Sequence, residues 1–141
     1  MIDRAAVVAE ARGWIGTRFH RQASVRGVGC DCIGLVVGVA RAFGFVGADV
    51  FATPEFRGYG SVPDPAKLIE AADRYLDPVE QAQPGDVLVF RIEDEPAHFG
   101  LLATPTTMVH SYARARRVVE VTLAPFWSAR LLRRYAFREA A

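Results

Sequence analysis

The chain has 141 residues, of which 51% are hydrophobic and 23% charged, and its formal net charge at pH 7 is +1. This balance is that of a globular protein with a real core, and it argues against a disordered chain. A charge so close to zero gives no overall field to attract nucleic acid or an anionic membrane, so neither is an expected partner. No stretch approaches the roughly 18 apolar residues of a membrane span. We expect a single domain over residues 1–141.

The N-terminus, Met1 to Arg4, leads directly into an amphipathic pattern without the basic and apolar regions of a secretory signal peptide. The two cysteines, Cys30 and Cys32, lie too close in sequence for ordinary disulfide geometry. We therefore expect free thiols in a protein made in the cytoplasm. Arginines cluster within 114–117 and 130–134. A solvated surface explains them, with a rim that binds carboxylates or a partner as the alternative.

Apolar residues at helical spacing predict three helices in the first half of the chain. The first runs from Asp3, a capping residue, to Ile15. The second runs from Cys32 to Phe43, with Gly44 as its C-terminal cap, and its apolar residues on nearly every face indicate a central, buried helix. The third begins at Asp64-Pro65, where aspartate caps and proline occupies the first turn.

The second half changes to the alternating pattern of strands. The predicted strands are Val87 to Ile92, His98 to Ala103, Thr107 to Tyr112, Arg117 to Leu123 and Leu131 to Phe137. Loops are expected at Thr17 to Gly29 and Gly47 to Val62, and an acidic turn at Glu93 to Pro96. Helices followed by a strand meander predict an α+β domain with a mainly antiparallel sheet of five to six strands.

The main chemical signal is Cys32 at the start of a predicted helix. Backbone N–H groups and the helix dipole favour negative charge there, so we expect this thiol to ionise more easily than usual. A thiolate is a nucleophile, and a histidine brought to it by the fold can act as its base. His98 and His110 are predicted in adjacent strands, and a short hairpin would make them cross-strand neighbours on one face. His110 would then orient His98, as the third member of a triad does.

Four segments resemble, in order, the motifs of the NlpC/P60 cysteine peptidases, which are bacterial cell-wall hydrolases with a papain-like fold. These segments are Gly29-Cys30-Asp31-Cys32-Ile33-Gly34-Leu35-Val36, Pro84-Gly85-Asp86-Val87-Leu88-Val89-Phe90, Ala97-His98-Phe99-Gly100-Leu101-Leu102 and Met108-Val109-His110-Ser111. The Gln22-Ala23-Ser24 loop and the doubled Cys-Asp-Cys are similar to a short phage-type branch that includes the peptidases of gene transfer agents.

The resemblance implies roles for particular residues. Cys32 would be the nucleophile, His98 the base and His110 the residue that orients the base. The backbone N–H of Cys32 and a donor from the Phe19–His20 loop would face the oxyanion. Two positions depart from the family pattern: Ile33 replaces a frequent serine, and Phe19 followed by His20 replaces a usual tyrosine.

Other roles are left open by the residues themselves. Asp31 has two possible roles, capping the helix or binding a substrate amine. The thiol chemistry that the resemblance implies requires neither metal nor cofactor. A zinc site built from Cys30, Cys32, His98 and His110 is the alternative, although its ligand spacing is unusual for a structural site.

The resemblance also implies a function. The chain would cut peptidoglycan stem peptides, between D-glutamate and diaminopimelate, as an endopeptidase. With no signal peptide, it would be carried by a phage-like tail, contact tail-tip or hub proteins, and act in the periplasm or cell wall. The alternatives are a structural tail-tip subunit with little turnover and a related thiol amidase or acyltransferase.

Overall fold

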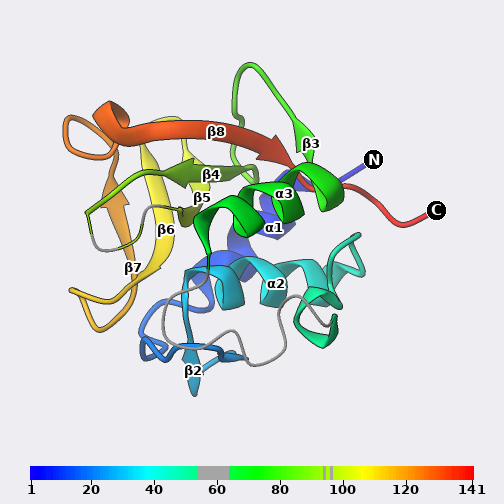
Figure 1. The fold of residues 1–141 in the computed structure, drawn as a ribbon, viewed down its shortest axis with the longest axis horizontal. Coiled ribbons are helices and arrows are strands. Elements are labelled where there is room, and N and C mark those ends of the chain that lie inside the picture. Colours follow the sequence, from blue (N-terminus) through cyan, green and yellow to red (C-terminus); the bar gives the residue numbers. More distant parts are fainter. Residues whose placement is uncertain (54–63, 94, 96) are drawn as a thin grey trace.

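The computed structural model describes residues 1–53, 64–93, 95 and 97–141. The described elements are α1 (Arg4–Arg12), β1 (Ser24–Val25), β2 (Gly29–Cys30), α2 (Cys32–Phe43), the 3-10 helix η1 (Val50–Ala52), α3 (Pro65–Tyr75), β3 (Asp77–Pro78), β4 (Val87–Phe90), β5 (His98–Thr104), β6 (Thr107–Tyr112), β7 (Arg117–Thr122), the 3-10 helix η2 (Ser128–Arg130) and β8 (Leu131–Ala136). They confirm the predicted α+β class, with helices gathered beside an antiparallel sheet (Figure 1). From residue 54 onward, the loop predicted at Gly47 to Val62 lies outside the described residues, as do Asp94 and Pro96 of the acidic turn.

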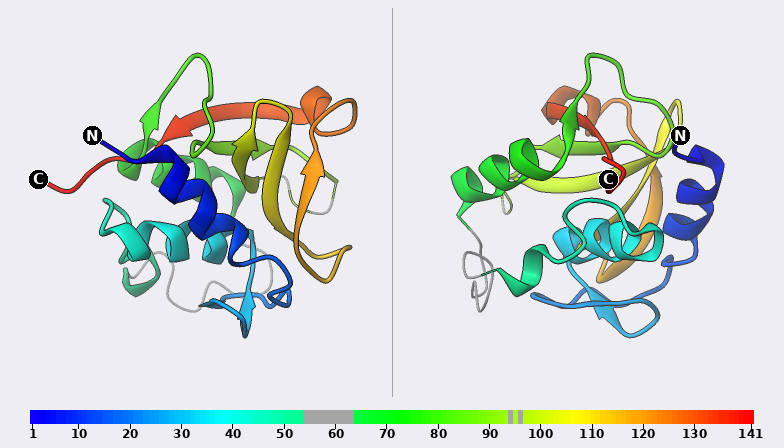
Figure 2. Two further views of the ribbon diagram at one scale, coloured as in Figure 1. Left: turned by 180° about the vertical axis from the view of Figure 1, so that it is seen from behind. Right: turned by 90° about the vertical axis from the view of Figure 1, so that its right-hand side faces the viewer.

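Helix α2 has the predicted bounds, and its ends follow from its capping residues. The Asp31 carboxylate accepts a hydrogen bond from the N–H of Gly34 at 2.7 Å, which satisfies a first-turn donor. Gly44 adopts a left-handed φ of 66° at the other end, a conformation that costs glycine little. The run of residues from Cys32 to Ala40 is buried, so α2 is the central helix, as expected. The right-hand view of Figure 2 places α1 and α3 on opposite sides of it.

Two predictions for the N-terminal part were wrong. The first helix ends at Arg12 rather than Ile15, because the chain turns after Gly13 and the Gly16 N–H bonds to the carbonyl of Val118 at 3.0 Å in β7. The segment predicted as a loop at Thr17 to Gly29 contains the short antiparallel hairpin β1–β2. The residues before this hairpin lie along β7, with an antiparallel bridge between Arg18 and Arg117, and so occupy the open edge of the sheet.

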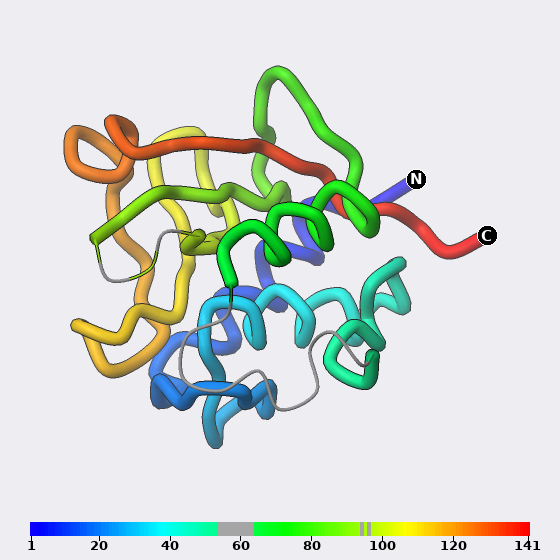
Figure 3. Tube along the Cα trace, viewed as in Figure 1, coloured from blue at the N-terminus to red at the C-terminus, as the bar shows by residue number. Residues whose placement is uncertain are grey.

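The main sheet has six strands in the order β3-β8-β4-β5-β6-β7, and every pair of neighbours is antiparallel. Strands β4 to β7 form the predicted meander. The last strand departs from it: β8 returns across the sheet to pair with β4 rather than β7, since the β7 edge is taken by the segment around Arg18. Strand β3, too short for an alternating pattern, was not predicted. The tube in Figure 3 follows this return and shows both chain ends on one side.

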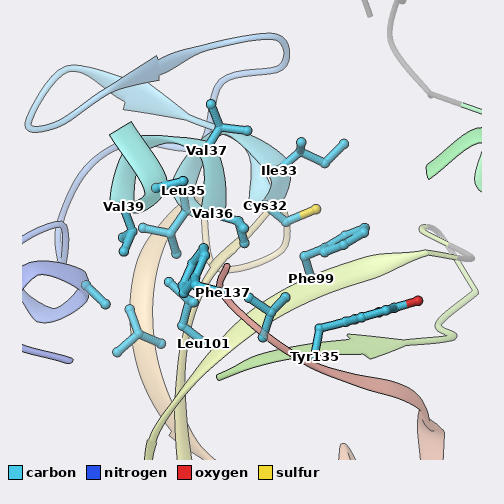
Figure 4. Close-up of a cluster of buried hydrophobic side chains, with 14 of the residues drawn as sticks. Cys32, Ile33, Leu35, Val36, Val37, Val39, Phe99, Leu101, Tyr135 and Phe137 are labelled. Atoms are coloured by element: carbon cyan, nitrogen blue, oxygen red, sulfur yellow. The ribbon is translucent and has the colours of Figure 1, made fainter. Parts of the chain in front are cut away.

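Apolar side chains cover both faces of the sheet. The larger cluster lies between the sheet and the helices, and Figure 4 shows part of it, including Leu35, Leu101 and Phe137. A second cluster, with Phe90, Leu102, Met108 and Trp127 among its members, covers the other face. Within the described residues, no helix is long and apolar enough to cross a membrane.

Candidate active site

The nucleophile segment is fixed to the sheet by two hydrogen bonds on Cys30. The Ser111 hydroxyl of β6 donates to the Cys30 carbonyl at 2.7 Å, and the Cys30 N–H donates to the carbonyl of Arg18 at 3.0 Å. Cys32 follows two residues later as the first residue of α2. Its sulfur leaves the helix on the side of Phe99 in β5 (Figure 4). The thiol is therefore held between the start of α2 and the start of β5.

The environment of Cys32 overturns one prediction, that its thiol ionises easily. Cys32 is only 5% exposed, and this burial raises the pKa of its thiol well above the usual value. The negative charges of Glu95 and Asp31 raise the pKa further, whereas the backbone N–H groups of Phe99 and Ile33 lower it. Burial and these carboxylates outweigh the helix start, so the thiol is protonated in this arrangement.

His98 and His110 lie side by side in β5 and β6, and the hydrogen bond predicted between their rings is present. His98 Nε2 is 2.7 Å from His110 Nδ1. The register pairs Leu101 with Val109, so His110 lies opposite Gly100 and the two histidines form a diagonal pair. A Cβ on Gly100 would lie 3.5 Å from that of His110 and 2.6 Å from Met108 Sδ, so a larger residue here would displace the Met108 side chain.

Aromatic rings enclose both histidines. Trp127 stacks on His98 with ring centroids 5.3 Å apart, and Tyr112 stacks on His110 at 5.1 Å. Burial, and then the proximity of His98, lower the pKa of His110 to about 3. His110 is therefore neutral at physiological pH, and its Nε2 has no hydrogen-bond partner within the described part of the chain. Neither Trp127 nor Tyr112 was expected from the sequence as a neighbour of the histidines.

Glu95 is a site residue that was not expected from the sequence. Its Oε2 is 2.6 Å from His98 Nδ1, and its Oε1 is 3.6 Å from a guanidinium nitrogen of Arg21. A carboxylate oxygen of Glu95, the Cys32 sulfur and a ring nitrogen of His98 all lie within 4.8 Å of one another. The available signal was its position, three residues before His98 in an acidic turn. That position alone suggested only a solvated turn.

The hydrogen bonds decide where protons lie on His98. An ionised carboxylate only accepts hydrogen bonds, so the contact with Glu95 places a proton on His98 Nδ1. Since Nε2 is engaged by His110, Nδ1 is the ring nitrogen left to receive the proton of the Cys32 thiol. Glu95 and the thiol therefore compete for the same nitrogen.

The remaining predicted residues lie at the edge of this cluster. His20 is exposed and its Nδ1 is 2.9 Å from the Arg21 carbonyl oxygen; within the described residues no hydrogen bond joins it to Cys32 or His98. Phe19 is half-buried under the guanidinium of Arg21, at 5.3 Å from its ring centroid. The oxyanion role of this loop stays a prediction.

Asp31 and Ile33 flank the thiol in the sequence. Asp31 is buried, and its two carboxylate oxygens accept from Gly34 N–H and from Gln22 N–H at 2.9 Å, so it caps α2 and joins it to the preceding loop. Its amine-binding role stays a prediction. Ile33 lines an apolar groove between α2 and α3, together with Phe99 and Leu68. The residue after the thiol therefore contributes apolar surface where the family pattern has a polar side chain.

The four-ligand zinc site considered from the sequence does not form as such. Among the described residues, the group close enough to share a metal ion is Cys32, Glu95 and His98, which omits Cys30 and His110. Both cysteines are free and buried. The ring of His110 faces His98 Nε2 instead, as an orienting partner.

Taken together, the fold and the site define an α+β domain with a helix-start cysteine beside a paired histidine on an antiparallel sheet. Residues 14–135 match the model of the NlpC/P60 family, and the chain belongs to that family. No curated protein matches the chain.

Several solved structures share the fold. The NlpC/p60 domain of the peptidoglycan hydrolase SagA has a TM-score of 0.62 and 20% identity, covering 96% of this chain and 99% of that one. NlpC1 from Trichomonas vaginalis has a TM-score of 0.65 and 14% identity, covering 97% of this chain and 44% of that one. An NLP/P60 family protein similar to a lipoprotein, from Staphylococcus aureus, has a TM-score of 0.64 and 17% identity, with coverages of 99% and 43%. This chain thus spans less than half of the last two proteins.

Proposed function

We propose that this chain is a cysteine endopeptidase that cuts peptidoglycan stem peptides. The observation that carries the proposal is the grouping of the Cys32 sulfur with His98, whose far ring nitrogen is held by His110, in a domain of the NlpC/P60 family. A thiol, a base and a group that orients the base are the parts that acyl transfer by cysteine requires. The peptidoglycan hydrolase SagA shares the fold, which supports the substrate class.

The reaction begins when Glu95 turns away and His98 changes tautomer: Nε2 gains a proton, which it donates to His110 Nδ1 in a hydrogen bond, and Nδ1 loses its proton to the solvent and is left with a free lone pair. That nitrogen takes the thiol proton, and the Cys32 sulfur attacks the scissile carbonyl carbon to form a tetrahedral intermediate. The backbone N–H of Cys32 at the start of α2 faces the developing oxyanion. His98 then gives the proton to the leaving amine, which departs as the thioester forms. Water, deprotonated by His98, hydrolyses the thioester and restores the thiol.

His110 acts through His98 rather than on the substrate. Being neutral, it offers its Nδ1 lone pair to the Nε2–H of His98, both in the neutral tautomer that accepts the thiol proton and in the imidazolium that results. The enclosing rings of Trp127 and Tyr112 fix the orientation of both imidazoles. His110 therefore keeps Nδ1 of His98 directed at the thiol.

The finer part of the proposal concerns the bond and the setting. The sequence resemblance to the phage-type branch supports cleavage between D-glutamate and diaminopimelate, and delivery by a phage-like tail through tail-tip or hub proteins to the periplasm or cell wall. A second candidate is a structural tail subunit without turnover. The buried, protonated state of Cys32 favours this alternative, because such a thiol is a poor nucleophile.

Digestion of purified sacculi tests the proposal. Wild type is expected to release muropeptides with a new amino terminus, identified by mass analysis, and Cys32→Ala to release none. Cys30→Ala is the matched control, since it removes the other buried thiol two residues away and should leave cleavage intact. Absence of cleavage by folded wild type favours the structural subunit, and equal cleavage by Cys32→Ala would rule out the thiol mechanism.

A further inference from the structure

Glu95 gives the site a donor set that the proposed peptidase reaction does not need. A sulfur, an imidazole nitrogen and a carboxylate oxygen, from Cys32, His98 and Glu95, lie within 4.8 Å of one another. We propose that these three side chains form a binding site for one thiophilic divalent cation, with Zn²⁺ as the preferred ion. The bound ion engages the thiol and the base together and so inhibits catalysis.

The separations suit a tetrahedral ion after small side-chain shifts. Zinc binds sulfur at about 2.3 Å and nitrogen or oxygen at about 2.0–2.2 Å, so its ligand atoms stand roughly 3.4–3.6 Å apart. Glu95 Oε2 and His98 Nδ1 are now 2.6 Å apart and would separate by about 0.8 Å to admit the ion. The sulfur, within 4.8 Å of the others, would close by about 1.2 Å at most. Side-chain rotations supply movements of this size.

The groups around the three ligands already hold them in place. His110 lies 2.7 Å from His98 Nε2, which leaves Nδ1 as the metal-binding nitrogen and gives the imidazole the hydrogen-bonded partner that metal-bound histidines usually have. Arg21 approaches Glu95 Oε1 at 3.6 Å and leaves Oε2 for the ion. A ligand carboxylate is commonly steadied in this way by a neighbouring donor.

The donor types decide which cation binds. One thiolate, one imidazole and one carboxylate suit zinc, or cobalt and cadmium as probes, whereas magnesium and calcium require oxygen ligands. Three protein ligands leave a fourth position for water. All three side chains are buried, with exposed fractions of 5% for Cys32, 7% for Glu95 and 0% for His98, so the ion would be shielded from bulk solvent.

Binding exchanges a proton for the metal in a balanced step. Zn²⁺ takes the place of the thiol proton on Cys32, which passes to the solvent, while His98 stays neutral with its one proton on Nε2, donated to His110 Nδ1 in a hydrogen bond, so that Nδ1 is free for the ion. The sulfur lone pair and the Nδ1 lone pair are then directed at the ion. Neither remains available for attack on a carbonyl or for proton transfer.

The inhibition of catalysis by the ion rests on the proposed function, whereas the metal site itself does not. The test therefore measures binding directly, on the purified full chain without substrate. Zn²⁺ is titrated in competition with a chromophoric chelator, and Co²⁺ is added separately to observe thiolate-to-cobalt charge transfer. We expect one ion per chain and a charge-transfer band that Cys32→Ser abolishes and Cys30→Ala retains.

Glu95→Gln tests the ligand that distinguishes this site from any cysteine–histidine pair. It is expected to weaken Zn²⁺ binding at least tenfold, since it replaces an anionic ligand by a neutral amide. Glu93→Gln, in the same turn but exposed, is the matched control and should bind as wild type does. Circular dichroism checks that each variant is folded.

The outcomes separate this proposal from the peptidase. Failure of folded wild type to bind one ion, or binding unchanged in Glu95→Gln, would overturn the metal site whatever the activity on sacculi. Stoichiometric binding that depends on Glu95 supports the site even where no cleavage is found. Where cleavage is found, added Zn²⁺ should stop it and a chelator should restore it. Continued cleavage by the zinc-saturated enzyme would contradict inhibition by the ion.

Discussion

At the residue scale, the negative charge of Glu95 controls the protonation of its neighbours His98 and Cys32. Its carboxylate holds a proton on His98 Nδ1 and, by its negative charge, raises the pKa of the Cys32 thiol. Both effects oppose formation of a thiolate. The resting arrangement is therefore a protonated pair, and reactivity depends on where the Glu95 side chain lies.

Neutralising Glu95 should make Cys32 more reactive. Glu95→Gln removes a negative charge close to the sulfur, so the pKa of the thiol falls and more thiolate is present at neutral pH. We expect iodoacetamide to alkylate Cys32 about tenfold faster at pH 7.5, as measured by mass mapping of the Cys32 peptide. Glu93→Gln should alkylate at the wild-type rate. An unchanged or slower rate in Glu95→Gln would contradict the electrostatic effect.

His110 predicts a loss of stability in acid. Its folded pKa of about 3 lies below its ordinary value of 6.5, so the folded state binds fewer protons than the unfolded chain. This contribution is fully present above pH 6.5 and is lost as the pH falls toward 3. Between pH 7 and pH 4, wild type should lose about 3 kcal/mol more than His110→Gln in urea unfolding. Equal losses in the two proteins would show that His110 titrates normally.

At the element scale, α2 depends on a close approach by the preceding loop. A Cβ at Gly34 would lie 1.8 Å from the backbone carbonyl oxygen of Ala23, so the loop and the first turn of the helix fit only around a glycine. Asp31 joins the same two segments through Gly34 N–H and Gln22 N–H. The position of the thiol thus rests on the contact between loop and helix.

Substitutions at Gly34 in α2 and at Gly44, its C-terminal cap, distinguish the effect of this contact on stability from the effect of backbone conformation. Gly34→Ala should destabilise the protein by about 3 kcal/mol, because the backbone of the loop must move. Gly44→Ala meets nothing within 4 Å and should cost only about 1 kcal/mol, from its left-handed φ. Urea unfolding measures both. A smaller loss for Gly34→Ala than for Gly44→Ala would mean that the loop does not pack as described.

At the scale of the whole molecule, the sheet links two apolar clusters into one folding unit. Trp14 belongs to the cluster between helices and sheet, and Trp127 belongs to the cluster on the other face. The same strands separate and contact both clusters, since side chains alternate between the faces of β4 and β6. Loss of either cluster therefore exposes the other.

The two tryptophans should report one unfolding transition. Trp14→Phe and Trp127→Phe each leave a single fluorophore in one cluster, and each fluorescence midpoint in urea should coincide with that from circular dichroism of the same variant. A separate transition of the Trp127 fluorescence at lower urea concentration would show that the second cluster, to which Trp127 belongs, unfolds on its own. The midpoints of the two variants need not be equal, because each substitution changes stability.

The sequence by itself determined the features that depend on interactions over a few residues. Asp31 and Gly44 set the ends of α2, the alternating pattern located β4 to β8, and the spacing of His98 and His110 predicted their contact, because caps, periodicity and short hairpins act over a few residues. The motifs also identified the family. These signals brought Cys32, His98 and His110 together at the site, but not Glu95.

Only the tertiary structure decided how deeply the side chains of that site are buried and which charges act on them. The return of β8 to β4, the pairing of the Arg18 segment with β7 and the burial of Cys32 depend on contacts between distant segments, which no local pattern encodes. Glu95 is the clearest case. Its position before His98 is visible in the sequence, but its effect on the thiol arises because packing of α2 on β5 brings Cys32 to it and excludes the water that would screen its charge.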